Sequence, residues 1–424
     1  MSILEITPHG AEPLGDRLAP ILARLAARRA TLARVPIDRL LALLDEFALR
    51  LAGDPGARMI EGVAFLSAWL RRANLERLVS LNLGPRAACL DGFVAEGSAY
   101  LAARPHGLVA MWLAGNVPTL PMFSLVPALL GKNVCLAKLA RPDAEAVSRL
   151  LAVLAQSRTE GLAGEELLGA MAIVWFDYRN AELSREMSSA ADARMIWGGS
   201  EAVEAVSRLP RPEHCVDLVF GPKYSIGVLG RRLLEGPAEP LDEAVQAFVR
   251  DVAAFDQRAC SSPQTIFVER NHRRSLRAIG ERFARFLARL PVKPEPDFHT
   301  TSRILAARAE WAMDAGRDVI ASGSEANWTV CLDRDVSLKE AVQSRTVFLT
   351  EVESWREVIP LISPKVQTIG IALGDLEESL ALAEAATAAG AARCVRPGLM
   401  NHYESPWDGK LVLTQLVRWV TLKP

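Results

Sequence analysis

Cysteine is scarce in this sequence, and the few cysteines are not grouped. The 424 residues contain six cysteines, with no CxxC pair and no repeated short spacing. Zinc ribbons and disulfide scaffolds need such groups, so we expect no metal site, and scattered thiols favour a reducing cytoplasm. The six are Cys89, Cys135, Cys215, Cys260, Cys331 and Cys394.

An excess of charge is also missing. The 49 Lys and Arg residues balance 50 Asp and Glu, and no polybasic block occurs, which argues against nucleic acid as a partner. The first twenty residues lack a basic stretch followed by an apolar one, so no export signal is expected. Residues 107–131 carry no charge, but Gly115, Asn116 and three prolines interrupt them. These breakers predict a buried strand, a turn and a helix, and no membrane span.

The GxGxxG dinucleotide motif is absent, yet the hydrophobic pattern predicts an α/β protein. Residues 19–52 and 58–80 have apolar residues at helical spacing. From residue 107 onward, strand-like apolar runs such as NVCLAKL alternate with helix-like segments such as RPDAEAVSRLLAVLAQ. Continuously apolar strands between helices predict a Rossmann-like parallel sheet with helices on both faces.

The length and the pattern predict more than one domain. Near residue 240 a second α/β unit begins, with the helical LDEAVQAFVRDVAAFDQ followed by the strand TIFVER. We expect an N-terminal helical region packed on the first sheet domain, then that domain, then a second α/β domain, and finally a C-terminal tail. Their bounds are 1–104, 105–239, 240–398 and 399–424.

Two motifs follow apolar strands of the first predicted sheet. In AGNVPTLP, Asn116 lies in a turn, where its amide can donate to a developing oxyanion or bond locally to the backbone. In CLAKLAR, Lys138 ends a strand and Arg141 begins the next loop. Open α/β sheets bind ligands at such strand ends, although charged residues there are also often only solvated.

A third motif joins the strand RMIW to the helix EAVEAV through Gly198, Gly199 and Ser200. Two glycines let the backbone approach a ligand. Ser200 at the helix N-cap and the unpaired N–H groups beside it favour a phosphate. The same residues also suit a plain turn.

The fourth motif is FDQRACSSPQ, residues 255–264, which contains Cys260. Free cysteines are most often small buried hydrophobes, and we expect this of the other five. Cys260 differs because Ser261, Ser262 and Pro263 place it in a polar turn, where a thiol is accessible enough to act as a nucleophile.

In their order along the chain, these four motifs resemble those of the aldehyde dehydrogenase superfamily. A closer resemblance, through RACSSPQ, GPKYSIGVL and GLMNHYESPWDG, is to the long-chain acyl-CoA reductase family, the fatty acid reductase component of bacterial bioluminescence. The resemblance covers roughly residues 105–424. It implies an aldehyde dehydrogenase-like fold, with a cofactor domain at 105–239 and a catalytic domain at 240–398.

The resemblance also implies roles for single residues. Cys260 would be the nucleophile that takes an acyl group from a thioester, and Asn116 would form an oxyanion hole with the backbone N–H of Cys260. Lys138 would bind the adenosine ribose. Gly199 and Ser200 would lie beside the pyrophosphate of the cofactor.

Two departures from the superfamily pattern sharpen the expected chemistry. Arg141 stands where many members have a glutamate that repels a 2′-phosphate, so we predict NADPH over NADH. Val219 stands where oxidising members have the glutamate that activates water. Without that base, the acyl-cysteine should resist hydrolysis and wait for hydride, which favours reduction to an aldehyde.

The expected function is therefore NADPH-dependent reduction of an acyl-CoA or acyl carrier protein thioester to an aldehyde, in a possible homo-oligomer. Alternatives are an acyl phosphate reductase, a cofactor-independent acyltransferase or thioesterase using Cys260, and a silent partner protein. Arg258 is a candidate activator of the thiol. Other candidates are the proton donors His214, His272 and His402, and the substrate-lining residues Tyr403, Trp407 and Asp408.

Overall fold

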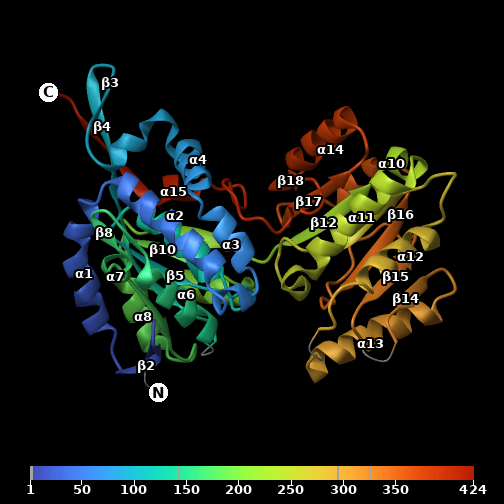
Figure 1. Ribbon diagram of the computed structural model, residues 1–424, viewed down its shortest axis with the longest axis horizontal. Coiled ribbons are helices and arrows are strands. Elements are labelled where there is room, and N and C mark those ends of the chain that lie inside the picture. The colour runs from blue at the N-terminus through green and yellow to red at the C-terminus, as the bar shows by residue number, and fades with distance from the viewer. Residues whose placement is uncertain (1–2, 142–143, 294–295, 324–325) are drawn as a thin grey trace. The chain divides into compact units, whose positions relative to one another are not determined.

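The computed structural model describes residues 3–141, 144–293, 296–323 and 326–424, which form two compact units (Figure 1). Unit 1 comprises Met1–Gly221 and Tyr403–Pro424, and unit 2 comprises Pro222–His402. The predicted α/β class with parallel sheets is confirmed in both.

Unit 1 is built on a seven-stranded sheet of order β11-β10-β5-β6-β9-β1-β2. The five strands from β11 to β9 are parallel, and β1 and β2 form an antiparallel hairpin beside β9. The strands of this sheet are β1 (Ile3–Thr7), β2 (Gly10–Gly15), β5 (Leu108–Trp112), β6 (Val134–Lys138), β9 (Met171–Trp175), β10 (Ala193–Trp197) and β11 (Val216–Phe220).

The helices of unit 1 fall into an N-terminal group and a group that connects the strands. The N-terminal group is α1 (Ala19–Ala33), α2 (Ile37–Gly53), α3 (Val63–Trp69) and α4 (Arg72–Leu83), with 3-10 turns η1 (Ala57–Met59) and η2 (Gly84–Leu90). The connecting group is α5 (Leu120–Leu130), α6 (Glu145–Gln156), α7 (Gly164–Leu168), α8 (Ala181–Ser189) and α9 (Ser200–Ser207). Because parallel crossovers are right-handed, α5 and α6 cover one face of the sheet and α8 and α9 the other.

Two smaller sheets complete unit 1. The three-stranded sheet has the order β19-β4-β3 and places the C-terminal strand at an edge. Its strands are β3 (Val94–Glu96), β4 (Ala99–Pro105) and β19 (Val417–Leu422), and the short helix α15 (Val412–Gln415) precedes β19. The two-stranded sheet consists of β7 (Arg158–Thr159) and β8 (Leu162–Ala163).

Unit 2 contains a second seven-stranded sheet of order β14-β15-β16-β13-β12-β17-β18, parallel except at β14. Its strands are β12 (Tyr224–Leu229), β13 (Pro263–Glu269), β14 (Asp318–Ala321), β15 (Thr329–Asp333), β16 (Thr346–Val352), β17 (Val366–Ala372) and β18 (Arg393–Val395). Its helices are α10 (Arg231–Glu235), α11 (Ala238–Ala253), α12 (Leu276–Leu287), α13 (Phe298–Met313) and α14 (Leu376–Ala388), with 3-10 turns η3 (Ala254–Gln257) and η4 (Trp355–Leu361).

Local chemistry explains where several helices begin. The side chains of Ser275, Asp297 and Asp375 each accept a backbone N–H in the first turn of α12, α13 and α14. The uncharged run at 107–131 forms β5, a turn and the 11-residue α5, as predicted. Within the described ranges, every helix is too short or too polar to span a bilayer.

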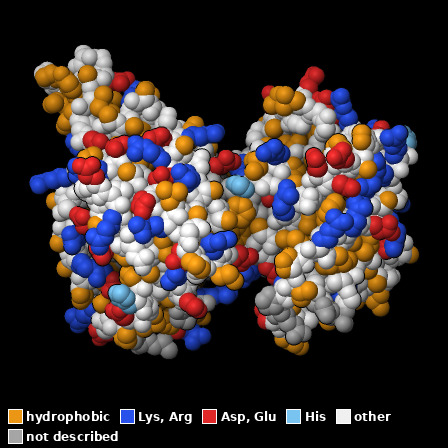
Figure 2. Space-filling view, viewed as in Figure 1, with side chains coloured by type: hydrophobic (Ala, Val, Ile, Leu, Met, Phe, Trp, Pro, Cys, Tyr) orange, Lys and Arg blue, Asp and Glu red, His pale blue; other side chains and the backbone are white. Residues whose placement is uncertain are grey.

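Cationic and anionic side chains are intermingled over unit 1 on the face drawn in Figure 2. Many arginines of this unit are paired with carboxylates, for example Arg71 with Asp45 at 2.6 Å and Arg72 with Glu76 at 2.8 Å. Exposed pairs of this kind contribute little to stability, typically about 0–1 kcal/mol each.

Candidate active site

The strand order of unit 1 creates a position where ligands bind in open α/β sheets. The chain runs from β5 to β6 and β9 in one direction and then returns to β10 on the other side of β5. The connections after β5 and β10 therefore diverge, and a crevice at the carboxyl ends of these strands is the expected binding position. Asn116 follows β5, and Gly199 and Ser200 follow β10, so these predicted residues flank this switch point.

Lys138 ends β6, the strand beside β5, and is only 7 % exposed. Its Nζ lies 4.9 Å from the centre of the Phe176 ring and donates to the carbonyl of Leu139 at 3.4 Å. Burial lowers the pKa of Lys138, and the nearby carboxylate of Asp177 acts in the opposite direction. The ammonium group is therefore held at the strand end by one aromatic ring and one carbonyl.

Arg141 is exposed, and its stem packs beside the Asn116 turn. A Cβ built on Gly115 would lie 3.4 Å from the Cγ of Arg141, so the glycine makes room for this stem. The structure thus brings Arg141 next to the turn that carries Asn116, although the two motifs are about 25 residues apart in sequence.

The two glycines in the turn after β10 have different surroundings. A Cβ on Gly198 would lie 2.9 Å from the Cβ of Ala202, so close packing of α9 requires glycine there. A Cβ on Gly199 would meet nothing within 4 Å, which leaves its surface open to a ligand. The predicted N-cap is wrong by one position: Gly199 caps α9, and Ser200 is its first residue, without a side-chain capping bond.

Buried contacts fix the elements around this turn. The fully buried Arg194 on β10 binds both carboxylate oxygens of Asp217 on β11 at 2.7 and 2.6 Å and also donates to the carbonyl of Val206 in α9. At the carboxyl ends of β10 and β11, the rings of Trp197 and Phe220 stack with their centres 3.9 Å apart. The position of α9 relative to the strand ends is therefore set by side chains.

The sequence reasoning did not identify the residues that follow β9. Asp177 accepts the backbone N–H of Arg179 at 2.9 Å, and the neighbouring Tyr178 is 77 % exposed. Both belong to the same sheet edge as Lys138 because β9 pairs in parallel with β6. A carboxylate directly after a buried strand was the signal that could have identified them.

In unit 2, Cys260 lies between α11 and β13 in a turn of intermediate exposure. The hydroxyl of Ser225, on β12, donates to the carbonyl of Cys260 at 2.7 Å. Just before the turn, Phe255, Asp256 and Gln257 have left-handed backbones, with φ of 55°, 47° and 62°. Such conformations are strained outside glycine and persist only where surrounding contacts enforce them.

Hydrogen bonds of the Gln257 side chain help to hold this left-handed backbone segment in place. Its amide donates to the carbonyls of Pro263 and Thr346, each at 2.9 Å, and accepts the N–H of Thr346 at 2.9 Å. Gln257, Ser225 and Asn401, which bonds to both serines after Cys260, were missed by the sequence reasoning because their partners are distant in sequence.

The remaining cysteines behave as the sequence predicts. Cys89, Cys135, Cys215 and Cys331 are buried, and Cys394 is partly buried. Burial raises the pKa of all five thiols, to about 12 for Cys331 and about 11 for Cys394. Their thiolate forms are therefore disfavoured.

The candidate proton donors His214 and His272, and the candidate thiol activator Arg258, occupy positions that give little support to those roles. His214 contacts Asp192, which precedes β10 and so lies at the amino edge of the sheet, opposite Lys138. His272 is exposed, and its backbone N–H donates to the Glu235 side chain at 3.2 Å. Arg258 is exposed and donates to the carbonyl of Phe255 at 3.1 Å.

Tyr403 belongs to an aromatic cluster inside unit 1. Its ring lies 5.0 Å from Trp69, 4.7 Å from Phe123 and 4.6 Å from Trp407, measured between centres. These contacts give Tyr403 and Trp407 a packing role.

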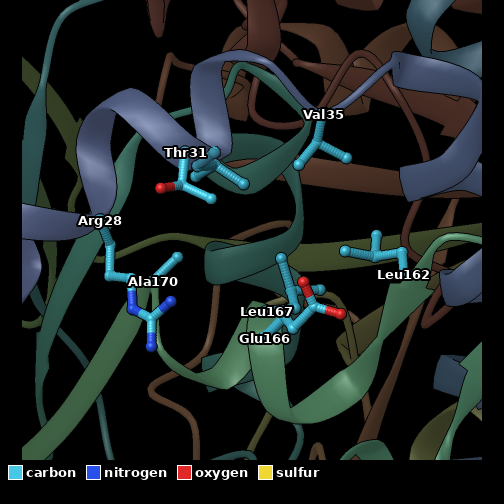
Figure 3. A pocket seen from close by; sticks show the side chains of 8 residues that line it. Arg28, Thr31, Val35, Leu162, Glu166, Leu167 and Ala170 are labelled. Carbon is cyan, nitrogen blue, oxygen red and sulfur yellow. The ribbon is translucent and has the colours of Figure 1, made fainter.

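A small pocket lies between α1 and α7, and the residues that line it differ from the predicted site residues (Figure 3). Ala170 directly precedes β9, so the pocket lies towards the amino ends of the parallel strands. Its lining is Arg28, Thr31, Leu32, Val35, Leu162, Glu166, Leu167 and Ala170.

Comparison with known proteins finds a matching family model and several curated relatives. The model of the acyl-CoA reductase (LuxC) family matches residues 34–419. The chain is 26% identical over 336 residues to a long-chain acyl-protein thioester reductase of Aliivibrio fischeri, and 27% identical over 336 residues to that of Vibrio harveyi. Each alignment covers 78% of this chain and 67% of the relative.

Solved structures show the same fold. Aldehyde dehydrogenase C of Pseudomonas syringae, solved with NAD+ and octanal, matches with a TM-score of 0.67 at 14% identity, covering 100% of this chain and 93% of its own. Aldehyde dehydrogenase 21 of Physcomitrella patens matches with a TM-score of 0.71 at 13% identity, covering 99% and 94%. The predicted aldehyde dehydrogenase-like fold is thereby confirmed.

Proposed function

Because the chain belongs to the acyl-CoA reductase (LuxC) family, we propose that it reduces an acyl thioester to an aldehyde with NADPH, through an acyl-cysteine at Cys260. The observation that carries this proposal is the position of Cys260. It lies in a turn of intermediate exposure just before β13, where the Ser225 hydroxyl donates to its carbonyl, whereas Cys89, Cys135, Cys215 and Cys331 are buried. A held, accessible thiol is what covalent catalysis requires.

The proposed reduction of the thioester proceeds in three steps. The Cys260 thiolate attacks the thioester carbonyl, the carbon–sulfur bond to the donor breaks, and the donor leaves as a thiol after taking up a proton. Hydride then adds to the carbonyl carbon of the acyl-cysteine. Collapse of the resulting thiohemiacetal oxyanion breaks the bond to Cys260, releasing the aldehyde and restoring the thiolate. Asn116 is the proposed donor to the acyl oxygen while it carries negative charge.

A bound nicotinamide cofactor would supply the hydride, and unit 1 has residues that fit it. The open surface at Gly199 and the unpaired N–H groups of the first turn of α9 suit a pyrophosphate. Lys138, held over Phe176 at the next strand end, suits a ribose hydroxyl. Arg141, exposed beside Gly115, offers a charged donor to a 2′-phosphate, which supports NADPH over NADH.

The acyl donor is proposed to be a thioester of coenzyme A or of a carrier protein. Relatives in Aliivibrio fischeri and Vibrio harveyi are named long-chain acyl-protein thioester reductases, which supports a fatty acyl group. Val219, which stands where the superfamily pattern has the water-activating glutamate, lies on β11 in register with Ile196 of β10. This supports reduction over hydrolysis of the acyl-cysteine.

We also propose a homo-oligomer formed through β19. This strand lies at the edge of its three-stranded sheet, where Trp419 and Leu422 are both at least 40% exposed. An edge strand with exposed apolar side chains can pair with the same strand of a second copy. Sedimentation of a Trp419→Lys variant as a monomer, beside an assembled wild type, is the expected result.

The function is tested by a panel of acyl-CoA and acyl carrier protein substrates, with NADPH consumption followed by absorbance. We expect NADPH oxidation and aldehyde release in equal amounts. Acyl transfer or free acid without NADPH consumption would instead favour an acyltransferase or thioesterase. Full activity of Cys260→Ala would refute every covalent version.

A further inference from the structure

A buried amide from the end of unit 2 holds the two serines that follow Cys260. Asn401 is 6% exposed and lies about 140 positions from the turn. The hydroxyls of Ser261 and Ser262 donate to its Oδ1 at 2.8 and 3.1 Å. Its Nδ2 donates to the carbonyl of Asp251, in α11, at 2.9 Å. One side chain therefore joins the helix before the turn to the residues after it.

The segment that carries Asn401 is itself fixed by Asp251. The Asp251 carboxylate accepts the N–H of Gly398 at 2.5 Å and also that of Met400. Asp251 is 3% exposed, and both serines are buried. In such an interior, losing Asn401 takes the acceptor from the Ser261 hydroxyl, while the Ser262 hydroxyl keeps the carbonyl of Ala254 as a second acceptor at 3.3 Å. The intact network therefore favours a single arrangement.

We propose that Asn401 is a positioning residue that holds the Cys260 thiol in its reactive orientation through Ser261 and Ser262. The inference rests on the proposed function, in which Cys260 is the nucleophile. Ser225 fixes the carbonyl of Cys260 from β12, and Asn401 fixes the next two side chains, so two separate elements hold the backbone directly after the thiol. Misplacing a reacting group by about 1 Å can cost roughly 100-fold in rate.

An amide is the side chain that this position needs. It accepts at one end, as the serine hydroxyls require, and donates at the other, as the Asp251 carbonyl requires. A carboxylate at residue 401 only accepts, whereas a protonated carboxylic acid can do both. Asn401→Asp should therefore be impaired when ionised and recover when protonated.

The test measures the acylation rate of Cys260 by intact-mass spectrometry after mixing with an acyl-CoA in the absence of NADPH. We expect Asn401→Ala to acylate about 10- to 100-fold more slowly than wild type, by the same ratio at every pH. The Asn401→Asp rate, divided by that of wild type, should rise as the pH falls from about 8 to about 6. Ser261→Ala, which leaves Asn401 one donor, should be slowed about threefold to tenfold.

Glu269→Ala provides the matched control. Glu269 is also 6% exposed and also joins separate segments, accepting the N–H groups of Arg231 and Trp355. It lies at the opposite end of β13 from Cys260, about 20 Å along the strand. The control should lose thermal stability without slowing acylation.

The outcomes separate the two proposals. If wild type forms no adduct on Cys260, the proposed function fails. If wild type is acylated and Asn401→Ala matches it within about twofold, the positioning role is overturned. Should Asn401→Ala not fold, an Asn401→Asp ratio that stays flat with pH, together with an unslowed Ser261→Ala, overturns it equally.

Discussion

The two candidate regions are built in different ways. In unit 1, Asn116, Lys138, Gly199 and Ser200 all lie within four residues of the carboxyl ends of their strands, so the sheet topology alone aligns them. In unit 2, the Cys260 turn is held by Ser225 and Asn401, 35 and about 140 positions away. The proposed cofactor edge is thus specified by local turns, whereas the position of the proposed nucleophile depends on long-range hydrogen bonds.

The largest expected effect comes from replacing Cys260, the proposed nucleophile of unit 2. We expect Cys260→Ala to lose roughly a thousandfold or more of the acyl reductase activity, since the covalent route is removed. NADPH affinity, which we assign to unit 1, should stay unchanged, as measured by fluorescence titration. Cys394→Ala is the matched control and should retain activity, because burial already raises the pKa of that thiol to about 11. Equal losses in both variants would contradict the assignment.

The buried carboxylate of unit 2 should make stability depend on pH. Burial raises the pKa of Asp251 to about 7 from 3.8, against the opposing effect of the N–H groups of Gly398 and Met400. Because the folded-state pKa is raised, the stabilisation is complete below about pH 4 and is lost as the pH rises through about 7. A shift of this size corresponds to about 4 kcal/mol.

Asp251→Asn removes this titration. The unfolding free energy of the variant should therefore fall less than that of wild type between about pH 4 and about pH 8, as measured by urea denaturation. Parallel pH profiles for the two proteins would show that Asp251 does not titrate in this range. Both the transition midpoint and the m-value need to be compared, since the chain contains two units.

The two glycines of unit 1 offer a closer contrast. Gly199→Ala should weaken NADPH binding about tenfold and leave thermal stability unchanged, because the new methyl group meets only the open space that we propose for the cofactor. Gly198→Ala should instead cost about 1–3 kcal/mol of stability, since its methyl group lies 2.9 Å from Ala202. Binding isotherms and melting curves of both variants decide the matter. The opposite pattern would move the pyrophosphate away from Gly199.

The smallest expected effect concerns the choice of cofactor. Arg141→Glu should lower the ratio of kcat/KM for NADPH to that for NADH by about tenfold, through loss of a donor and repulsion of the 2′-phosphate. Arg50→Glu, at an exposed position on α2, is the control and should leave the ratio unchanged. A wild-type preference for NADH would contradict the role of Arg141.

The sequence predicts those parts of the fold that form from local patterns and misses parts that depend on contacts distant in sequence. Alternating apolar runs predicted β5, β6, β9, β10 and β11 and the helices α5, α6, α8 and α9, because these elements form from local patterns. The β1–β2 hairpin was missed, as was β12, whose run YSIGVL contains serine and glycine at positions that only its neighbours β13 and β17 explain. A Cβ on Gly227 would lie 2.5 Å from the Phe248 ring, a constraint that exists only in the folded unit.

The residues of the candidate site also fall into those that local sequence predicts and those that it does not. Cys260 could be predicted from its polar turn, and Gly199 from a strand followed by a helix. Asn401 and Gln257 could not, since nothing next to them in sequence indicates their partners. The left-handed residues Phe255 and Asp256 also escape prediction, because their backbone conformation is imposed by tertiary contacts.

The most direct test of the central claim is to trap the acyl-enzyme. The protein is mixed with an acyl-CoA in the absence of NADPH, digested, and analysed by mass spectrometry. We predict one acyl group on the peptide that contains Cys260, and its loss as aldehyde, in equal amount, when NADPH is added. An unmodified Cys260 peptide, or release of the acyl group as free acid on addition of NADPH, would contradict the account.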